Sequence, residues 1–271
     1  MDDSITVVTV TRRRVPLLQR CIESVKNQSC KGSVQHLIIT DDCPQTISWL
    51  ACSYPSDSKL RHQLVKRSPE ERSGPPRLAR LRNYANRLVE TPWTAFLDDD
   101  NEYEVNHLFS LLQCVAETGC PAVHSHRKLV CFEGTPFLEP RWPWCRDPQQ
   151  GEQRYRELVE KGVMQAGSNI IRDRVDLSPG RSYIMLVDTS EWLIKTEVLQ
   201  SIRIPETFSL QDWLDNLAED DKLVEALVSS RIRIACSELP SLKYYLGGYS
   251  NDFDGKYPHS EHWLFNGRLT A

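Results

Sequence analysis

The regular alternation of apolar runs with helix-like segments in residues 1–118 restricts the fold most. Short apolar runs predict buried strands, whereas apolar residues at three- and four-residue spacing predict helices. The expected order is strand 5–10, helix 15–28, strand 36–40, helix 45–51, strand 60–66, helix 78–90, strand 93–97 and helix 105–117. This alternation predicts an α/β fold with a mainly parallel central sheet flanked by helices.

The second half of the chain is less regular. It contains a Pro- and Trp-rich stretch at Pro136–Pro148, an expected strand near Ser182–Val187 and an expected helix at Asp220–Ser230. We expect these elements to extend the sheet at its edge, with loops that cover its open end. Both halves would then form a single domain.

The bulk composition excludes several classes of partner. With a net charge of −4, 40% hydrophobic and 26% charged residues, the chain reads as a soluble globular protein without general attraction to nucleic acid or to anionic membranes. The first residues, MDDSITVVTV, lack the basic start of a secretory signal, and no apolar stretch approaches the roughly 20 residues that span a bilayer. We expect a cytoplasmic protein with no membrane span.

The nine cysteines show no C-x-x-C spacing, and a cytoplasmic setting keeps thiols reduced. Several, such as Cys21 and Cys114, fall on apolar faces of expected helices. We expect free and mostly buried thiols, because free cysteine behaves as a small hydrophobic residue.

Acidic residues follow two of the expected strands. Asp41-Asp42 directly follows the apolar run HLIIT, and Asp98-Asp99-Asp100 directly follows the apolar run WTAFL. Ligands of parallel sheets bind beyond the carboxyl ends of the strands, and clustered carboxylates favour a bound cation. Mg²⁺ and Mn²⁺ prefer such oxygens together with substrate phosphates.

The alternative explanation of Asp98–Asp100 is a solvated turn in which an aspartate caps the next helix. The D-x-D spacing alone is a weak signal, because Asp252-Phe253-Asp254 repeats it without a preceding strand.

Glycine-rich phosphate loops are excluded. The first strand leads into Thr11-Arg12-Arg13-Arg14, and the first glycine of the chain is Gly32. The chain therefore lacks a P-loop and a dinucleotide fingerprint. A sugar-nucleotidyltransferase is one alternative function for an α/β chain of this kind. That class also needs a glycine-rich loop after its first strand, and residues 11–16 contain no glycine.

Four segments, in order along the chain, carry a resemblance to a known family. They are ITVVTVTRRRVPLLQRCIESVKNQS, LIITDD, LARLRNYANRLVETPWTAFLDDDN and LAEDDKLVEAL. Together they resemble family 2 glycosyltransferases with the GT-A fold, over most of residues 5–245. The resemblance implies a metal-dependent, inverting transfer of a sugar from a nucleotide-sugar donor to an acceptor hydroxyl.

The resemblance also implies roles for the acidic residues. Asp42 or its neighbour Asp41 would bind the nucleobase or ribose, and Asp98 and Asp99 would contact the ribose side. Asp100 would hold a divalent metal, Mn²⁺ or Mg²⁺, under the diphosphate.

Other residues complete the implied site. Thr11 joins the nucleotide-sugar-binding set. Arg82 of the Ala-Arg-Asn match would face the phosphates, together with Arg77 or Arg72 nearby. A solvated basic helix face is the competing explanation for these arginines. Asp220 would be the base, although adjacent acids at a helix start also complement the helix dipole.

Donor and acceptor are less defined. A UDP-sugar is the first choice, with TDP- or GDP-sugars behind it, because Arg12 replaces the family's aromatic residue after the first strand. Residues 1–118 would bind the nucleotide sugar. Residues 119–271 would bind a glycan, lipid-linked or small-molecule acceptor.

Two further sets of residues are candidates in the second half. His259 or His262 could complete the metal site, and four tryptophans could stack on acceptor sugars, namely Trp142, Trp144, Trp192 and Trp213. A binding module that keeps the nucleotide crevice without turnover remains the alternative outside the enzymes.

Overall fold

The computed structural model describes residues 2–71, 74–175, 187–248 and 250–251. Its strands are β1 (Ile5–Thr11), β2 (Val34–Asp41), β3 (Leu60–Val65), β4 (Trp93–Phe96), β5 (Glu102–Tyr103), β6 (Ala122–Val130), β7 (Ile170–Ile171), β8 (Trp192–Lys195) and β9 (Ile234–Tyr245). Its α-helices are α1 (Val15–Lys26), α2 (Pro44–Ser53), α3 (Pro75–Asn86), α4 (His107–Thr118), α5 (Pro148–Glu160), α6 (Thr196–Ile202), α7 (Leu210–Leu214) and α8 (Glu219–Ser229). A 3₁₀ turn, η1 (Thr189–Glu191), precedes β8.

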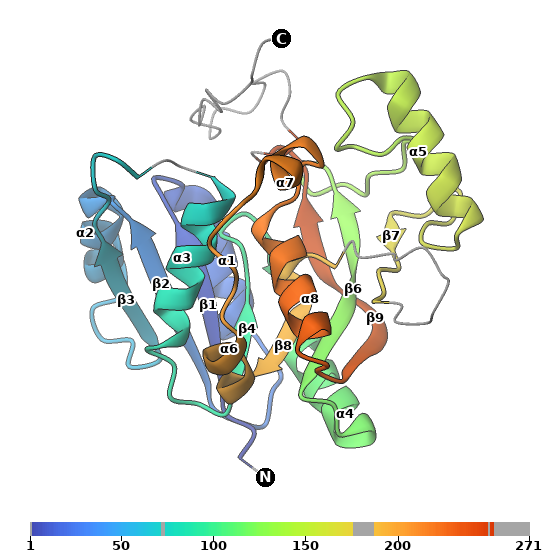
Figure 1. Ribbon diagram of the computed structural model, residues 1–271. Coiled ribbons are helices and arrows are strands. Elements are labelled where there is room, and N and C mark those ends of the chain that lie inside the picture. The colour runs from blue at the N-terminus through green and yellow to red at the C-terminus, as the bar shows by residue number, and fades with distance from the viewer. Residues whose placement is uncertain (1, 72–73, 176–186, 249, 252–271) are drawn as a thin grey trace.

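The strands form one mixed sheet with helices on both faces (Figure 1). Its order is β3-β2-β1-β4-β8-β6-β9-β5, and β7 pairs with β6 off this path. β1 pairs in parallel with β2 and β4, and β2 pairs in parallel with β3. β8 runs antiparallel to β4 and β6, whereas β6 and β9 are parallel. The predicted α/β class is confirmed, and strands from both halves of the chain share one sheet.

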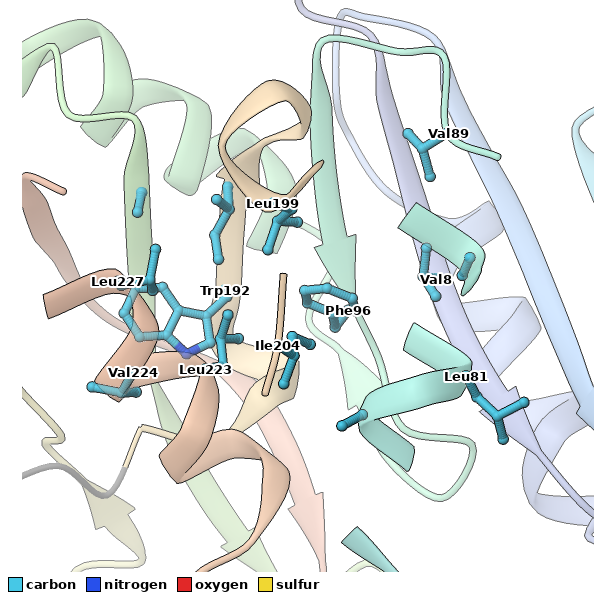
Figure 2. Packing of buried hydrophobic residues seen from close by; sticks show 14 of the residues in the cluster. Val8, Leu81, Val89, Phe96, Trp192, Leu199, Ile204, Leu223, Val224 and Leu227 are labelled. Atoms are coloured by element: carbon cyan, nitrogen blue, oxygen red, sulfur yellow. The ribbon is translucent and has the colours of Figure 1, made fainter. Parts of the chain in front are cut away.

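Two apolar layers hold the helices to the sheet. On one face, α3, α6 and α8 pack on β1, β4 and β8, where Leu81, Leu199 and Leu223 surround Phe96 and the fully buried Trp192 (Figure 2). On the other face, α1 and α4 cover the alternate residues of the same strands. This alternation follows from the two-residue period of a strand, and each large side chain buried in this way contributes about 1.5–3 kcal/mol.

Proline residues set the start of several helices. Pro16, Pro44, Pro75 and Pro148 all lie in the first turn of a helix, where the missing N–H costs nothing. For this reason α3 begins at Pro75, three residues before the predicted start at 78. It ends at Asn86 and not at the predicted residue 90.

The second half adds a satellite core around α5, in which Trp142, Tyr155 and Leu158 are buried. The predicted helix at 220–230 is confirmed as α8, whereas the strand expected near 182–187 lies almost entirely outside the described residues. All nine cysteines are free thiols, as predicted. Only four of them are buried, while four are half-buried and Cys52 is exposed, so the expectation of mostly buried thiols is wrong. Within the described part of the chain, no helix combines the length and hydrophobicity needed to cross a membrane.

Candidate active site

Three neighbouring parallel strands deliver polar residues to one edge of the sheet. Thr11 is the last residue of β1, Asp41 is the last residue of β2, and Asp98 follows β4 after one intervening leucine. Because β1 lies between β2 and β4 in parallel register, these strand ends lie together. The predicted convergence of the two acidic clusters at one sheet edge is therefore present.

The segment Asp98–Asn101, here called the acidic loop, is tied to the end of β1. Asp99 is only 3% exposed, and its Oδ2 accepts a hydrogen bond from the Thr11 hydroxyl at 2.6 Å. Its Oδ1 accepts from Arg14 Nη1 at 2.9 Å. Both oxygens of Asp99 are thus engaged within the protein.

Asp100 is half-buried, with 17% of its side chain exposed. Its carboxylate pairs with Arg14, and Arg20 Nη2 donates to its backbone carbonyl at 2.7 Å. After β9 the chain passes so close that a Cβ on Gly248 would lie 2.8 Å from Asp100 Oδ2. The backbone of Gly248 therefore lies against the Asp100 carboxylate, and a side chain at position 248 would push that carboxylate aside.

Arg82 joins the acidic loop to the start of α8. This α3 residue is 3% exposed; its Nη2 donates to Asp98 Oδ1 at 2.7 Å, and its Nη1 pairs with Glu219. Glu219 directly precedes Asp220 on α8. One guanidinium therefore brings the acidic loop and the predicted base into the same site, although 121 residues separate Asp98 from Glu219 in sequence.

Asp220 lies in the acidic first turn of α8. Its Oδ1 accepts the backbone N–H of Asp221 at 3.0 Å, and Asp221 Oδ2 accepts the N–H of Ala218 at 2.8 Å. Burial raises the pKa of Asp220 well above its ordinary value, and the charges of Asp221, Glu219 and Asp188 raise it further. Asp220 therefore stays protonated to a higher pH than an exposed aspartate.

The pKa values of two aspartates in the acidic loop are raised as well. Burial raises the pKa of Asp98 to about 7, opposed by Arg82 and reinforced by Asp188 and Asp100. Burial likewise raises the pKa of Asp99 to about 6, opposed mainly by Arg14. Carboxylates outnumber guanidinium groups here, and this imbalance favours an additional cation.

Asp41 has a different environment. It is buried at 3% exposure, accepts from Arg77 Nε at 3.1 Å and Nη2 at 2.8 Å, and also pairs with Arg67. Arg77 is thus held by Asp41 and by Glu71, whereas Arg82 contacts the acidic loop.

Asp42, the residue after Asp41, is only half-buried and has a positive φ of 48°. Arg72 lies outside the described residues.

Sequence reasoning missed the turn η1 and its N-cap residue Asp188. Ser190 Oγ accepts the N–H of Asp98 at 3.2 Å, and Asp188 Oδ1 accepts the N–H of Ser190 at 2.9 Å. The negative charge of Asp188 acts on Asp98, Arg82 and Asp220 together. Its signal was present in the sequence, because D-x-x-E before the apolar run WLI is a capping-box pattern.

The donor set fits a metal held largely by its substrate. In the described residues no group of three or more His, Cys, Asp or Glu side chains is arranged to hold an ion. Mg²⁺ and Mn²⁺ are commonly bound by one or two carboxylates plus phosphate oxygens, so the single carboxylate of Asp100 suits this mode. His259, His262, Asp252 and Asp254 lie outside the described residues.

The four tryptophans named as sugar platforms separate into different environments. Trp192 is fully buried and Trp142 is 8% exposed, so both belong to cores. Trp213 lies on α7 with 41% exposure, whereas Trp144 is half-buried. Only Trp144 and Trp213 retain a surface that a ligand can reach.

The α/β sheet carries the acidic loop at one edge, and Arg82 joins this loop to Glu219 at the start of α8. Residues 6–177 match the model of glycosyl transferase family 2. The chain belongs to glycosyl transferase family 2. A search of curated protein sequences gives no match.

Solved structures support the GT-A fold. The structure of S. aureus TarS 1-349 has a TM-score of 0.58 at 14% identity, with 89% of this chain and 60% of that chain covered. Its complex with UDP has a TM-score of 0.58 at 16% identity, with 91% and 62% covered. Its complex with UDP-GlcNAc has a TM-score of 0.52 at 15% identity, with 89% and 58% covered. This chain therefore spans about 60% of the TarS 1-349 length.

Proposed function

We propose that this chain transfers a sugar from a nucleoside diphosphate donor to an acceptor hydroxyl with inversion at the anomeric carbon. The observation that supports the proposal is the Arg82 bridge, which joins Asp98 to Glu219, the residue directly before Asp220 on α8. Family membership supports the reaction class, and the complexes of TarS with UDP and UDP-GlcNAc support a UDP-sugar as the first donor to test.

Asp220 is the proposed base. The acceptor oxygen forms a bond to the anomeric carbon while its proton passes to the Asp220 carboxylate. The bond between the anomeric carbon and the diphosphate oxygen breaks, and its electron pair leaves with the nucleoside diphosphate. A carboxylate whose pKa is raised toward the working pH suits this task, because it holds the proton that it receives.

Arg82 and Asp100 are the proposed contacts on the leaving-group side. The Arg82 guanidinium would add positive charge near the departing diphosphate. Asp100 would hold a Mn²⁺ or Mg²⁺ ion, which as a Lewis acid would stabilise the negative charge on that group. Thr11 and Asp99 would keep the loop in position, because both carboxylate oxygens of Asp99 are engaged.

The other predicted contacts remain proposals. Asp42, being half-buried, is the residue of its pair available to a nucleobase or ribose, while Asp41 holds Arg67 and Arg77. A glycan, lipid-linked or small-molecule acceptor and a cytoplasmic location stay predictions.

Release of nucleoside diphosphate from UDP-, TDP- and GDP-sugars with Mn²⁺ tests the proposal. Asp220→Asn should lower the rate by about 10²–10⁴-fold, the usual contribution of a general base, and leave UDP affinity intact. Asp215→Asn, an exposed aspartate just after α7, is the matched control and should keep the wild-type rate. UDP binding without turnover of any donor would point to a binding module and overturn the proposal.

A further inference from the structure

An aromatic pair lies where the satellite core meets the proposed active site. The rings of Trp144 and Tyr244 have centroids 5.3 Å apart at an angle of 57°, and Trp142 packs against Trp144 at 4.6 Å. Trp142 is buried, whereas Trp144 and Tyr244 are half-buried. The pair therefore forms the edge of this core.

The end of β9 brings this pair to the acidic loop. Next to Tyr244, the N–H of Tyr245 donates to Asn101 Oδ1 at 3.0 Å. Four residues after Tyr244, Gly248 packs against Asp100. Burial and the charges of Asp188 and Asp100 raise the pKa of Tyr244 well above its ordinary value, so these carboxylates lie within electrostatic range of the phenol.

Arg127 fixes the pair relative to the turn η1. Its guanidinium carbon lies 5.7 Å from the Trp144 centroid and 5.5 Å from the Tyr244 centroid. The same guanidinium pairs with Glu191 at 2.9 Å and Asp173 at 3.0 Å, and Glu191 Oε2 accepts the N–H of Asp188 at 2.7 Å. Rings, arginine and Asp188 therefore form one connected unit.

The polar edges of both rings are also fixed. Trp144 Nε1 donates to Ser250 Oγ at 3.0 Å, and the Tyr244 hydroxyl lies 3.5 Å from the same oxygen. Trp142 and Arg127 already contact these rings, so a ligand would meet only the part of each half-buried ring that they leave exposed.

A pyranose ring is the ligand that this arrangement suits. One face of such a ring carries C–H groups that pack on an aromatic surface, and its hydroxyls donate to carboxylates. We propose that Trp144 and Tyr244, together with Asp188, form a subsite for one pyranose ring, either the sugar of the donor or the first sugar of the acceptor. The inference rests on the proposed function, because it places a substrate sugar beside the acidic loop.

Calorimetric titration of the full chain with defined probes tests this subsite. UDP measures the nucleotide site alone, and UDP-glucose and UDP-GlcNAc add a donor sugar. Methyl β-glucoside and methyl β-N-acetylglucosaminide, titrated in the presence of UDP, represent an acceptor sugar. Thermal unfolding of each variant reports whether it folds.

Trp144→Leu keeps apolar volume but removes the ring. It should leave UDP affinity within about twofold and weaken binding of the sugar probes by about tenfold, in line with the loss of an aromatic stacking contact. Trp144→Phe should restore most of that affinity, and Asp188→Asn should weaken the same probes. Trp213→Ala, at an exposed tryptophan on α7, should change none of these values.

The two sugar sources give different results. A loss confined to the UDP-sugars assigns the subsite to the donor, and a loss confined to the methyl glycosides assigns it to the acceptor. If wild type binds UDP but gains nothing from any sugar probe, or if Trp144→Leu binds them all like wild type, the inference is overturned alone. Failure of wild type to bind UDP, TDP and GDP alike overturns the proposed function and this inference with it.

Discussion

The two acidic clusters at the sheet edge are built alike in sequence but differ in charge balance. Asp41, after β2, is held by the two guanidinium groups of Arg67 and Arg77. The acidic loop after β4 pairs with Arg14 and with Arg82, but it shares Arg82 with Glu219. The loop also lies within range of the negative charge of Asp188. A carboxylate that is already neutralised stabilises the fold, whereas an excess of negative charge prepares a site for a cation and a base.

Among stability effects, the largest is expected for Arg82→Met. Removing this buried guanidinium leaves Asp98 and Glu219 without their shared partner, and breaking a buried ion pair costs about 3–5 kcal/mol. Urea unfolding at pH 8 should give this loss of unfolding free energy. The loss should be smaller at pH 5, because Asp98, whose pKa burial raises to about 7, is then protonated and needs no partner charge.

The matched control for Arg82 is Arg80→Met on the same helix. Arg80 has 58% side-chain exposure and pairs with Glu71, so its removal should change the unfolding free energy little. Equal losses for Arg80→Met and Arg82→Met would contradict the distinction between an exposed pair and a buried bridge.

A smaller loss is expected for Asp41→Asn. Arg77 would lose the charge of Asp41 but keep its contact with Glu71 at 2.9 Å, and charged hydrogen bonds contribute about 1.5–3 kcal/mol. Urea unfolding should place this variant between Arg80→Met and Arg82→Met. A loss as large as that of Arg82→Met would mean that the two clusters do not differ in charge balance.

The smallest expected effect is a shift in pH dependence. The charge of Asp221 helps to raise the pKa of Asp220, so Asp221→Asn should lower that pKa. A base must be deprotonated to act, and the acid limb of the transfer rate should therefore move to lower pH. The asparagine oxygen can still accept the N–H of Ala218, which preserves the start of α8.

Glu225→Gln is the control for that pH profile. Glu225 lies further along α8 with 58% side-chain exposure, and it pairs with Lys222. Its profile should overlay that of wild type. An acid limb that stays in place in Asp221→Asn would argue against Asp220 as the titrating base.

Local pattern was sufficient to predict the first half of the fold and the placement of its acids. Buried strand runs and helix periodicity gave the β1–β4 region, and parallel strands bring Asp41 and Asp98 to one edge for purely geometric reasons. The hydrogen bond between Thr11 and Asp99 follows from the same adjacency of β1 and β4. Only the structure shows that this bond ties the acidic loop to the end of β1.

The second half depended on contacts that no local pattern contains. β6 and β9 pair in parallel across more than 100 residues, with shifts of register beside His126, and this pairing carries Tyr244 to the site. Trp192 could have stacked on a sugar by its residue type, yet it fills the core between the sheet and α8 (Figure 2). Arg127 in a buried strand likewise finds its partners only through tertiary packing.

The most direct test of the central claim is the Mn²⁺ dependence of UDP binding in wild type and Asp100→Asn, measured by titration calorimetry. Mn²⁺ should tighten UDP binding to wild type by at least about tenfold, because Asp100 would hold the ion and the ion would add positive charge beside the diphosphate. Asp100→Asn should lose this gain while keeping its metal-free affinity, and Glu104→Gln should keep both. The account would be contradicted if Mn²⁺ left the UDP affinity of wild type unchanged. It would also be contradicted if Mn²⁺ tightened UDP binding to Asp100→Asn as much as to wild type.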